Sequence, residues 1–279
     1  MQGLFKPWRH VLGVLPLGLV VGSADLITAA PATDPAVLAG QCSSAVGKLP
    51  QRTPRALGSE LEILSWNIQK AGNPGWDRDL ADFSAGIDLA FLQEASLQAE
   101  IESTVAAPLF TSFARGYTTE LLETGVMTLS RHLPTLRCQL SINEPWLGTP
   151  KATSVTEYPL ENRDDRLLAI NLHAVNFSFG TEEFGTQFRV LGDILERHDG
   201  PVILAGDLNT WSKRREALVA GFLQNHGLLP VEFVDDQRTR AFGRALDHVY
   251  VRGMQASRAE VIPVSSSDHN PLRVSLRIE

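Results

Sequence analysis

Several short segments of this sequence end an apolar run with side chains that could bind a metal ion or transfer a proton. In the clearest, Leu204–Asn209, an apolar run leads to Asp207, and Asn209 follows two residues later. A carboxylate at the carboxyl end of a buried strand lies where α/β proteins place their active sites. Gly206 would let the backbone approach whatever Asp207 serves, and Asn209 would share its face if the chain stays extended. The alternative is an ordinary turn, because Asp and Asn both favour loop starts.

Two further segments contribute a second carboxylate and an imidazole. Ser266–Pro271 places Asp268 beside His269, so one side chain could bind a metal and the other could face a phosphate; a polar turn closed by proline is the alternative. Asp247 lies within another apolar run, on the opposite face from His248. A carboxylate in such a strand is costly unless it is paired. We therefore expect Asp247 to hold His269 and to fix its tautomer.

Three more apolar runs end in Asn67, Glu94 and His173. Oxygen ligands such as the Glu94 carboxylate suit magnesium or manganese better than zinc. In a straight strand, His173 and Asn176 would face opposite ways. Both can therefore serve one site only if the chain bends after His173.

Convergence of Glu94, Asp207, Asp247 and Asp268 would create a repulsion that must be relieved. Two carboxylates ~4 Å apart repel by ~1 kcal/mol in water and by ~4 kcal/mol at the effective dielectric constant near a protein surface. A divalent cation would relieve this repulsion directly, and no lysine cluster of similar size is visible in the sequence. These carboxylates therefore predict a bound Mg²⁺ or Mn²⁺ ion.

The elements that must position these residues are predicted from the spacing of apolar residues. We expect strands over residues 61–68, 88–92, 125–130, 135–142, 153–159, 167–173, 201–205, 245–252, 258–263 and 271–278. Helices are expected over residues 182–198, where Phe184, Phe188 and Leu191 share one face, and over residues 211–224. Many strands with helices between some of them predict packed sheets with helices outside.

The composition limits the class of protein. A chain of 279 residues can hold one large α/β domain or two small ones. Its net charge of −7 argues against a protein that coats nucleic acid by bulk electrostatics, because such proteins carry a basic surface. A phosphate-ester substrate stays compatible with this charge, since a bound metal ion would supply local positive charge.

Residues 1–59 differ from the rest of the chain. Lys6 and Arg9 precede an apolar run over residues 11–22, which is typical of a signal peptide. The run is short for a membrane span but could become an uncleaved anchor if it extended through Ile27. We therefore expect a protein that is exported or anchored in the inner membrane on its periplasmic side, with its N-terminus near the membrane. The alternative is an apolar arm on a cytoplasmic protein.

The remainder of the N-terminal part predicts a linker. Residues 29–59 are rich in Ala, Pro, Gly, Ser and Thr without periodicity, which is typical of a flexible segment. The ordered domain is expected over residues 60–279. Cys42 and Cys138 are too few for a disulfide framework. A bridge between them is the alternative to the two free thiols that we expect.

Two basic stretches have different expected roles. Lys213–Arg215 opens a predicted helix, and we expect a solvated basic face there. Arg238, Arg240 and Arg244 lie on the loop before the Asp247 strand. Because arginine can bind a phosphate with two hydrogen bonds, we expect Arg240 and Arg244 to bind the substrate.

The order of these motifs resembles that of the endonuclease/exonuclease/phosphatase superfamily, which includes DNase I, abasic-site nucleases, neutral sphingomyelinases and inositol polyphosphate phosphatases. The likeness spans residues 60–279 and rests on Asn67, Glu94, His173, Asn176, Asp207, Asn209, Asp247, Asp268 and His269. Segments 125–130, 173–178 and 235–244 look more specifically like small bacterial members of uncertain substrate. The resemblance implies a four-layer α/β sandwich in which two mixed β-sheets pack face to face with helices outside.

The resemblance also implies a role for each motif residue. Glu94, with Asn67 nearby and Asp268 as a further carboxylate, would hold the metal. Asp207 would orient or deprotonate the attacking water, and Asn209 would position the phosphate. His269, paired with Asp247, would stabilise the pentacoordinate phosphate, and His173 would contact it from the opposite side. The expected chemistry is an in-line attack whose charge is neutralised by metal and imidazolium.

Two positions distinguish this chain from some branches of the superfamily. Gln69 stands where abasic-site nucleases carry an acidic residue, and His173 instead of tyrosine resembles DNase I and the lipid phosphoesterases. We expect a monomeric phosphodiesterase with nucleic acid as the first substrate class. The alternatives are a phospholipid or small phosphate-ester hydrolase and a catalytically silent binding domain, although the complete motif set speaks against a silent domain.

Overall fold

The structure of the protein, a computed structural model, describes residues 35–48, 55–107, 109–145, 148–178 and 180–279. All of these residues belong to one compact unit, Thr33–Glu279. The signal-peptide-like run expected over residues 11–22 lies outside the described residues. Within the part of the chain that the structure describes, no helix has the length and the apolar character that a membrane crossing requires.

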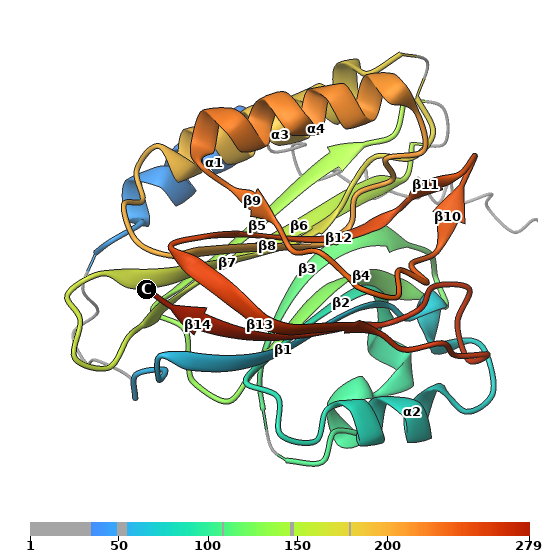
Figure 1. Cartoon of the computed structure of the whole chain (residues 1–279). Helices are drawn as coiled ribbons and strands as arrows, with labels where there is room; N and C mark the ends of the chain where they lie inside the picture. Colours follow the sequence, from blue (N-terminus) through green and yellow to red (C-terminus); the bar gives the residue numbers. More distant parts are fainter. Residues whose placement is uncertain (1–34, 49–54, 108, 146–147, 179) are drawn as a thin grey trace, which may run out of the picture. The chain divides into compact units, whose positions relative to one another are not determined.

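Two six-stranded sheets form the centre of this unit (Figure 1). The first has the strand order β13-β14-β1-β2-β4-β3 and comprises β1 (Glu60–Asn67), β2 (Leu89–Ser96), β3 (Phe110–Thr118), β4 (Glu123–Ser130), β13 (Met254–Val261) and β14 (Leu272–Ile278). The second has the order β5-β6-β7-β8-β12-β9 and comprises β5 (Leu136–Asn143), β6 (Pro150–Pro159), β7 (Arg166–His173), β8 (Val202–Asp207), β9 (Leu229–Pro230) and β12 (Asp247–Arg252). Only the β1–β2 and β7–β8 neighbours within these sheets are parallel, so both sheets are mixed.

Helices cover the outer faces of the sheets. They are α1 (Pro35–Ala45), α2 (Trp76–Phe83), α3 (Glu182–Leu195) and α4 (Lys213–His226). Short 3₁₀ turns, η1 (Gln69–Ala71), η2 (Leu97–Ala99) and η3 (Ile101–Ser103), and a small hairpin of β10 (Arg240–Ala241) and β11 (Arg244–Ala245) complete the described elements. Figure 1 shows α1, α3 and α4 over the second sheet and α2 against the first. The expected four-layer α/β sandwich is confirmed.

Strand alternation distributes the apolar side chains between the layers. Ile63 and Phe91 of the first sheet pack with Ile203 of the second in the core between the sheets. Leu64, one residue along β1, turns the other way and packs with Leu80 of α2. Because side chains alternate along a strand, successive residues pack in turn between the two sheets and between a sheet and its covering helix.

All of the predicted strands and both predicted helices are present, with ends that differ by a few residues. The spacing of apolar residues did not predict β3 or α2. Helix α2 spans only eight residues, too few to display a clear helical period. In β3 the buried positions include the small residues Ser112, Ala114 and Gly116, so the strand lacks the apolar run that marks its neighbours.

The expected flexible linker is wrong for residues 35–48. Residues 35–45 form α1, and contacts beyond its C-terminal end attach the chain to the second sheet. Gly47 donates its backbone N–H to Glu157 Oε1 over 3.0 Å, and Arg166 donates to the Lys48 carbonyl over 3.0 Å. Arg166 also pairs with Glu157 at 2.9 Å, so these two charges satisfy each other in the buried strands while they hold the end of α1.

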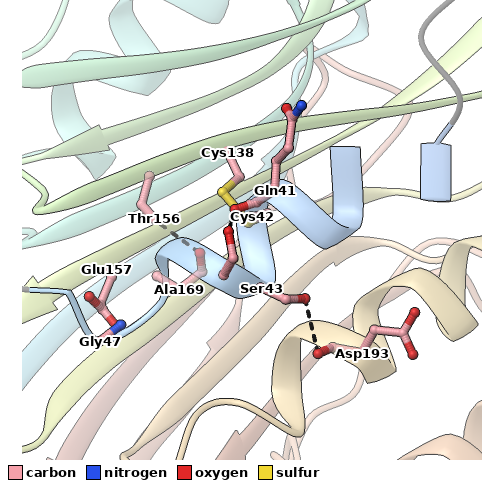
Figure 2. The surroundings of a disulfide bond; sticks show 10 residues. Gln41, Cys42, Ser43, Gly47, Cys138, Thr156, Glu157, Ala169 and Asp193 are labelled. Carbon is pink, nitrogen blue, oxygen red and sulfur yellow. Dashed lines mark hydrogen bonds between the residues drawn. A yellow bond between two sulfur atoms is a disulfide. The ribbon is translucent and has the colours of Figure 1, made fainter. Parts of the chain in front are cut away.

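The two cysteines are joined, which corrects the expectation of free thiols. Cys42 of α1 and Cys138 of β5 form a disulfide, with their Cα atoms 5.8 Å apart (Figure 2). Ser43 adds a hydrogen bond of 3.1 Å to the Asp193 carbonyl of α3. The sequence could not reveal the bridge because the partners are 96 residues apart and meet only once α1 has docked.

The glycine of the β8 motif serves the sheet itself. Gly206 has φ +144°, and a Cβ atom there would lie 2.0 Å from the carbonyl oxygen of Leu172 in β7. The close approach is therefore to the neighbouring strand, and not to a ligand of Asp207. Only glycine lets β8 deliver Asp207 beside the end of β7.

Removing the disulfide is expected to destabilise the fold. The Cys42→Ser/Cys138→Ser double variant should lose about 2–5 kcal/mol of unfolding free energy, because the bridge closes a long loop of the unfolded chain. Urea unfolding with and without a reductant measures this loss. Reductant should weaken the wild type by a similar amount and leave the double variant unchanged; a wild type that is insensitive to reductant contradicts the prediction.

A methyl group at Gly206 is expected to lower the unfolding free energy much more than a methyl group at Gly221. Gly206→Ala should cost at least about 1–3 kcal/mol, because the β7 carbonyl cannot move away without breaking the ladder. Gly221→Ala is the matched control: it lies in α4 with open space around the added Cβ, so it should be neutral or stabilising by about 0.5–1 kcal/mol. Equal unfolding free energies of the two variants would refute this account of β8.

Candidate active site

The ends of strands from both sheets meet at one place. Asn67 ends β1, His173 ends β7 and Asp207 ends β8, while Asp247 begins β12. Within the second sheet, Asp207 lies opposite His173 on one side and opposite Asp247 on the other. The pairing registers therefore bring residues that are distant in the sequence into one polar cluster.

Asp207 is the centre of this cluster. Asn67 of the other sheet donates its side-chain N–H to Asp207 Oδ2 over 3.1 Å, and the backbone N–H of Asn209 donates to Oδ1 over 3.0 Å. The Nε2 atoms of His173 and His269 lie 3.5 and 4.0 Å from Oδ2. The Asp207 carboxylate thus lies close to residues from both sheets and from the loop that carries His269.

Burial sets the protonation behaviour of Asp207. Its side chain is almost completely inaccessible to solvent. Loss of hydration, together with the nearby Asp247 charge, raises its pKa to about 6 against the opposing charge of His269. A carboxylate with a raised pKa accepts a proton more readily than a solvated one, which suits a general base.

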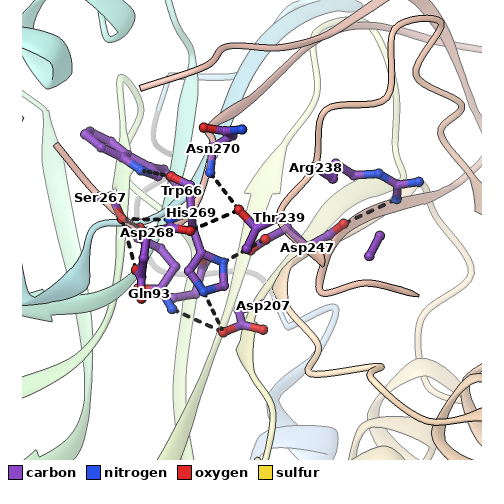
Figure 3. Close-up of polar contacts among 12 residues, drawn as sticks. Trp66, Gln93, Asp207, Arg238, Thr239, Asp247, Ser267, Asp268, His269 and Asn270 are labelled. Carbon is purple, nitrogen blue, oxygen red and sulfur yellow. Dashed lines mark hydrogen bonds and ion pairs between the residues drawn. The ribbon is translucent and has the colours of Figure 1, made fainter. Parts of the chain in front are cut away.

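His269 is built to carry a positive charge. Its Nδ1 lies 2.8 Å from Asp247 Oδ2, as the sequence predicted (Figure 3). Burial by itself lowers the pKa of His269, but the charge and the hydrogen bond of Asp247 outweigh burial and raise the pKa to about 10. Trp66 Nε1 donates to the His269 carbonyl over 2.9 Å and fixes the loop. The imidazolium therefore faces Asp207 in a fixed orientation.

Ser267 joins this loop to β1. Its hydroxyl donates to the Asn67 carbonyl over 2.7 Å and accepts the backbone N–H of His269 over 3.2 Å. Asp268 between them is exposed, and its backbone N–H donates to Gln69 Oε1 over 3.3 Å. Ser267 therefore connects the end of β1, at Asn67, to the backbone of His269. The sequence assigned this serine no role of its own.

A second line of charged groups extends from His173. Its Nε2 lies 4.0 Å from Glu94 Oε1, and Lys70 Nζ lies 3.4 Å from Glu94 Oε2. On the other side, Lys151 Nζ lies 3.0 Å from His173 Nε2. Burial first, and then the charge of Lys151, lower the pKa of His173 well below its usual range. His173 is therefore neutral here.

These two lysines are the residues that the sequence reasoning missed. No lysine cluster was visible, because Lys70 and Lys151 come from distant segments and meet only in the fold. Lys70 follows Asn67 by three positions, a spacing that could have drawn attention to it. Lys151 lies near the start of β6, a strand that carries no other candidate, so the sequence offered no signal for it.

The backbone around the site is held in an unusual conformation. Glu94, Asn209, Gln69 and Lys70 all have φ between 49° and 61°, the left-handed region that residues with a side chain seldom adopt. Glu94 lies in a break of the β2–β4 pairing between Leu92 and Ala95. Such bulges re-aim a side chain. Strained residues of this kind persist where the surrounding structure enforces them, and they cluster at functional sites.

A buried amide pair lies beneath the site. Gln93 of β2 donates to Asn171 Oδ1 of β7 over 2.8 Å, which links the two sheets. Asn171 donates in turn to the carbonyls of Leu92 and Met127. The sheets are thus cross-linked next to the bulge that carries Glu94.

The donor set suits a hard cation at Glu94. In the part of the chain that the structure describes, no three His, Cys, Asp or Glu side chains are grouped closely enough to enclose a metal. Magnesium is often held by only one or two carboxylates, with water and substrate oxygens completing its shell. Glu94 offers such a carboxylate and already attracts the Lys70 ammonium. Asn67 turns its Oδ1 to the Gln69 N–H, and Asp268 makes no recorded contact with Glu94 among the described residues.

Asn176 and the two predicted substrate arginines have other partners. The chain does bend after His173, but Asn176 Oδ1 accepts from Trp211 Nε1 over 3.0 Å. Arg240 pairs with Asp236, and Arg244 pairs with Glu216 at 2.8 Å. None of these side chains has a recorded contact with Asp207 or His269 in the described residues, so their binding of substrate stays a prediction.

The remaining arginine of the loop is structural. Arg238 donates to the Asp247 carbonyl over 3.3 Å (Figure 3). It also binds Asp236 through two nitrogens. It also lies 3.3 Å from Nδ1 of His248, whose Nε2 lies 2.7 Å from Thr210 Oγ1. As expected, His248 points away from His269.

The expectation of a solvated basic helix face is wrong for Arg215. This side chain is completely buried, because α4 turns it inward against the rings of Phe184 and Trp211, 4.5 and 4.6 Å from its guanidinium carbon. It donates to the carbonyls of Asn209 and Asn176 over 3.1 and 2.8 Å. Arg215 thus holds the loops that follow β7 and β8.

Known proteins resemble this chain in sequence and in fold. The sequence profile of the Endonuclease/Exonuclease/phosphatase family matches residues 64–269. The UPF0294 protein VV2535 of Vibrio vulnificus (strain YJ016) is 40% identical over 227 residues, which are 78% of this chain and 77% of that protein. Among solved structures, the mannosyl-6-phosphatase of Bacteroides thetaiotaomicron has a TM-score of 0.59 at 16% identity and covers 77% of this chain and 99% of its own. D. rerio TDP2 complexed with single-strand DNA product has a TM-score of 0.55 at 16% identity, and the match covers 78% of this chain and 99% of TDP2. The chain therefore belongs to the endonuclease/exonuclease/phosphatase family.

Proposed function

We propose that this protein is a divalent-metal-dependent phosphoesterase that hydrolyses a phosphodiester by in-line attack of an activated water. Members of the family hydrolyse phosphodiester or phosphate-ester bonds. The observation that carries the proposal is the buried Asp207 facing the His269 imidazolium, which Asp247 fixes from behind. One group can accept a proton while the other neutralises negative charge.

The residues divide the reaction between them. Asp207 takes the proton of the attacking water, and its raised pKa favours that step. His269 stabilises the negative charge that develops on the phosphate, since Asp247 keeps its imidazole protonated. A Mg²⁺ or Mn²⁺ ion at Glu94 would act as a Lewis acid on a phosphate oxygen. Asn209 orients the base, because its backbone N–H holds Asp207 Oδ1.

Nucleic acid is the first substrate class that we propose. TDP2, which shares the fold, is bound to a single-strand DNA product in its structure. A phospholipid or a small phosphate ester is the second candidate, since a sugar phosphatase shares the same fold. Monomeric function remains a prediction.

We also propose that the protein acts outside the cytoplasm, near the membrane through its N-terminus. The Cys42–Cys138 bridge supports this location, because disulfides persist in oxidising compartments. Alkylation of thiols in intact source cells, followed by mass spectrometry, should find both cysteines oxidised. Two alkylated thiols would place the protein in a reducing compartment.

Hydrolysis assays on the full-length protein test the proposed activity. Plasmid DNA, single-stranded RNA, sphingomyelin and bis(p-nitrophenyl) phosphate are offered with Mg²⁺ or Mn²⁺. Asp207→Asn and His269→Ala should each lower turnover by about 10²- to 10⁴-fold, as expected for loss of a proton-transfer or charge-stabilising group. Asp199→Asn, an exposed carboxylate removed from the site, is the matched control. Wild-type turnover of Asp207→Asn would overturn its role as base.

The metal site is tested by a magnesium titration in the same assay. Glu94→Ala should raise the Mg²⁺ concentration needed for half-maximal activity at least about tenfold, equivalent to ~1.4 kcal/mol of binding free energy. Glu102→Ala removes an exposed carboxylate nearby in the sequence and should leave the titration unchanged. Superimposable titrations of Glu94→Ala and the wild type would exclude Glu94 as the ligand.

A further inference from the structure

Lys151 occupies the active site without belonging to any of its motifs. Its ammonium lies 3.0 Å from His173 Nε2, and that nitrogen lies 3.5 Å from Asp207 Oδ2. Only one side chain therefore separates this ammonium from the proposed base.

The strand pairing explains how a lysine reaches this position. β6 pairs with β7 from Thr153 opposite Leu172 onward, so the start of β6 extends past the end of β7. Lys151 lies on this overhang, where β5 alone pairs with it through Ile142. The overhang carries the side chain alongside His173 at the mouth of the site.

Lys151 also lines a pocket that opens beside the site. The pocket has a volume of about 260 Å³. Its lining includes Glu94, His173 and Lys70 at the site, and Tyr117 and Phe177, which are 39% and 58% exposed. The ammonium thus faces space that a bound molecule can enter, next to the groups that would act on a phosphate.

The two lysines of this pocket differ in their partners. Lys70 is paired with the Glu94 carboxylate. Within the described residues, the His173 imidazole is the hydrogen-bond partner of Lys151, and no carboxylate pairs with it. Glu144, the other carboxylate of the pocket, is already engaged by two backbone N–H groups and by the Thr149 hydroxyl. An ammonium without a carboxylate partner is free to bind an anion.

We propose that Lys151 binds a non-bridging oxygen of the substrate phosphate, with that oxygen replacing His173 Nε2 as the acceptor of its hydrogen bond. This inference rests on the proposed phosphoesterase function and adds a substrate-binding residue to it. A contact between ammonium and phosphate is a charge-assisted hydrogen bond, which is stronger than one to a neutral imidazole. When Lys151 binds the phosphate instead of His173, the Nε2 atom of His173 becomes available to contact the bound substrate.

Binding of inorganic phosphate to the full-length protein tests this role without requiring turnover. Isothermal titration calorimetry is performed with EDTA and again with Mg²⁺. Lys151→Met should weaken phosphate binding at least about tenfold in both conditions, as loss of a charged hydrogen bond predicts. Lys151→Arg should stay within a few-fold of the wild type. Lys213→Met is the matched control, because it removes an exposed lysine of α4 and should bind as the wild type does.

The kinetic signature is a second readout. With the best ester and Mg²⁺, Lys151→Met should lower kcat/KM, and Lys151→Arg should restore most of it. Lys151→Gln replaces the methionine variant if the latter does not fold, which its thermal unfolding reveals. Phosphate binding that is undetectable in the wild type, unchanged in Lys151→Met, or equally weakened in Lys213→Met overturns the proposal.

The two proposals fail in distinguishable ways. If phosphate binding depends on Lys151 but no ester is hydrolysed with either metal, the lysine site stands and the proposed catalysis fails. If esters are hydrolysed and Lys151→Met binds phosphate as the wild type does, the catalysis stands and Lys151 is not a substrate-binding residue.

Discussion

The hydrogen bond from Asn67 to Asp207 crosses between the two sheets, and the site depends on the geometry that allows it. It forms only if the ends of β1 and β8 meet, which requires the sheets to pack face to face in one relative position. The Gln93–Asn171 hydrogen bond secures that position from within the core, because breaking it would leave a buried donor and a buried acceptor unpaired. Packing of the apolar residues brings the sheets together, and these polar links determine how they align.

This alignment places opposite charges where each needs the other. Asp207 and Asp247 lie directly across from one another on adjacent strands, an arrangement that is unfavourable for two carboxylates alone. His269 lies within reach of both and supplies the compensating charge. The lysines beside Glu94 and His173 add positive charge at the other end of the cluster. A protein with a net charge of −7 thus contains a site in which negative and positive groups are locally balanced.

The sequence predicted what is local and could not predict what depends on docking. Asp207 and the Asp247–His269 pair were found because each follows or interrupts an apolar strand, so strand alternation alone decides their direction. Arg215 was misread because a basic helix turn gives no sign of which residue faces inward. The linker was misread at α1, because its helix is stabilised by a disulfide and by contacts with distant strands, and not by its own residue pattern. Lys151 was missed for the same reason, because its position depends on how far β6 extends past its neighbouring strand β7.

The register of β12 has a consequence for how this protein can vary. Asp247 and His248 are neighbours that face opposite ways: Asp247 contacts His269, whereas His248 contacts Arg238. Deleting or inserting one residue upstream in this strand would exchange their faces and present a neutral ring to His269. We therefore expect length changes to be tolerated in the β10–β11 hairpin just before the strand but not within the strand. Homologous chains should keep a constant count from Asp247 to the end of β12 even where the hairpin grows or shrinks.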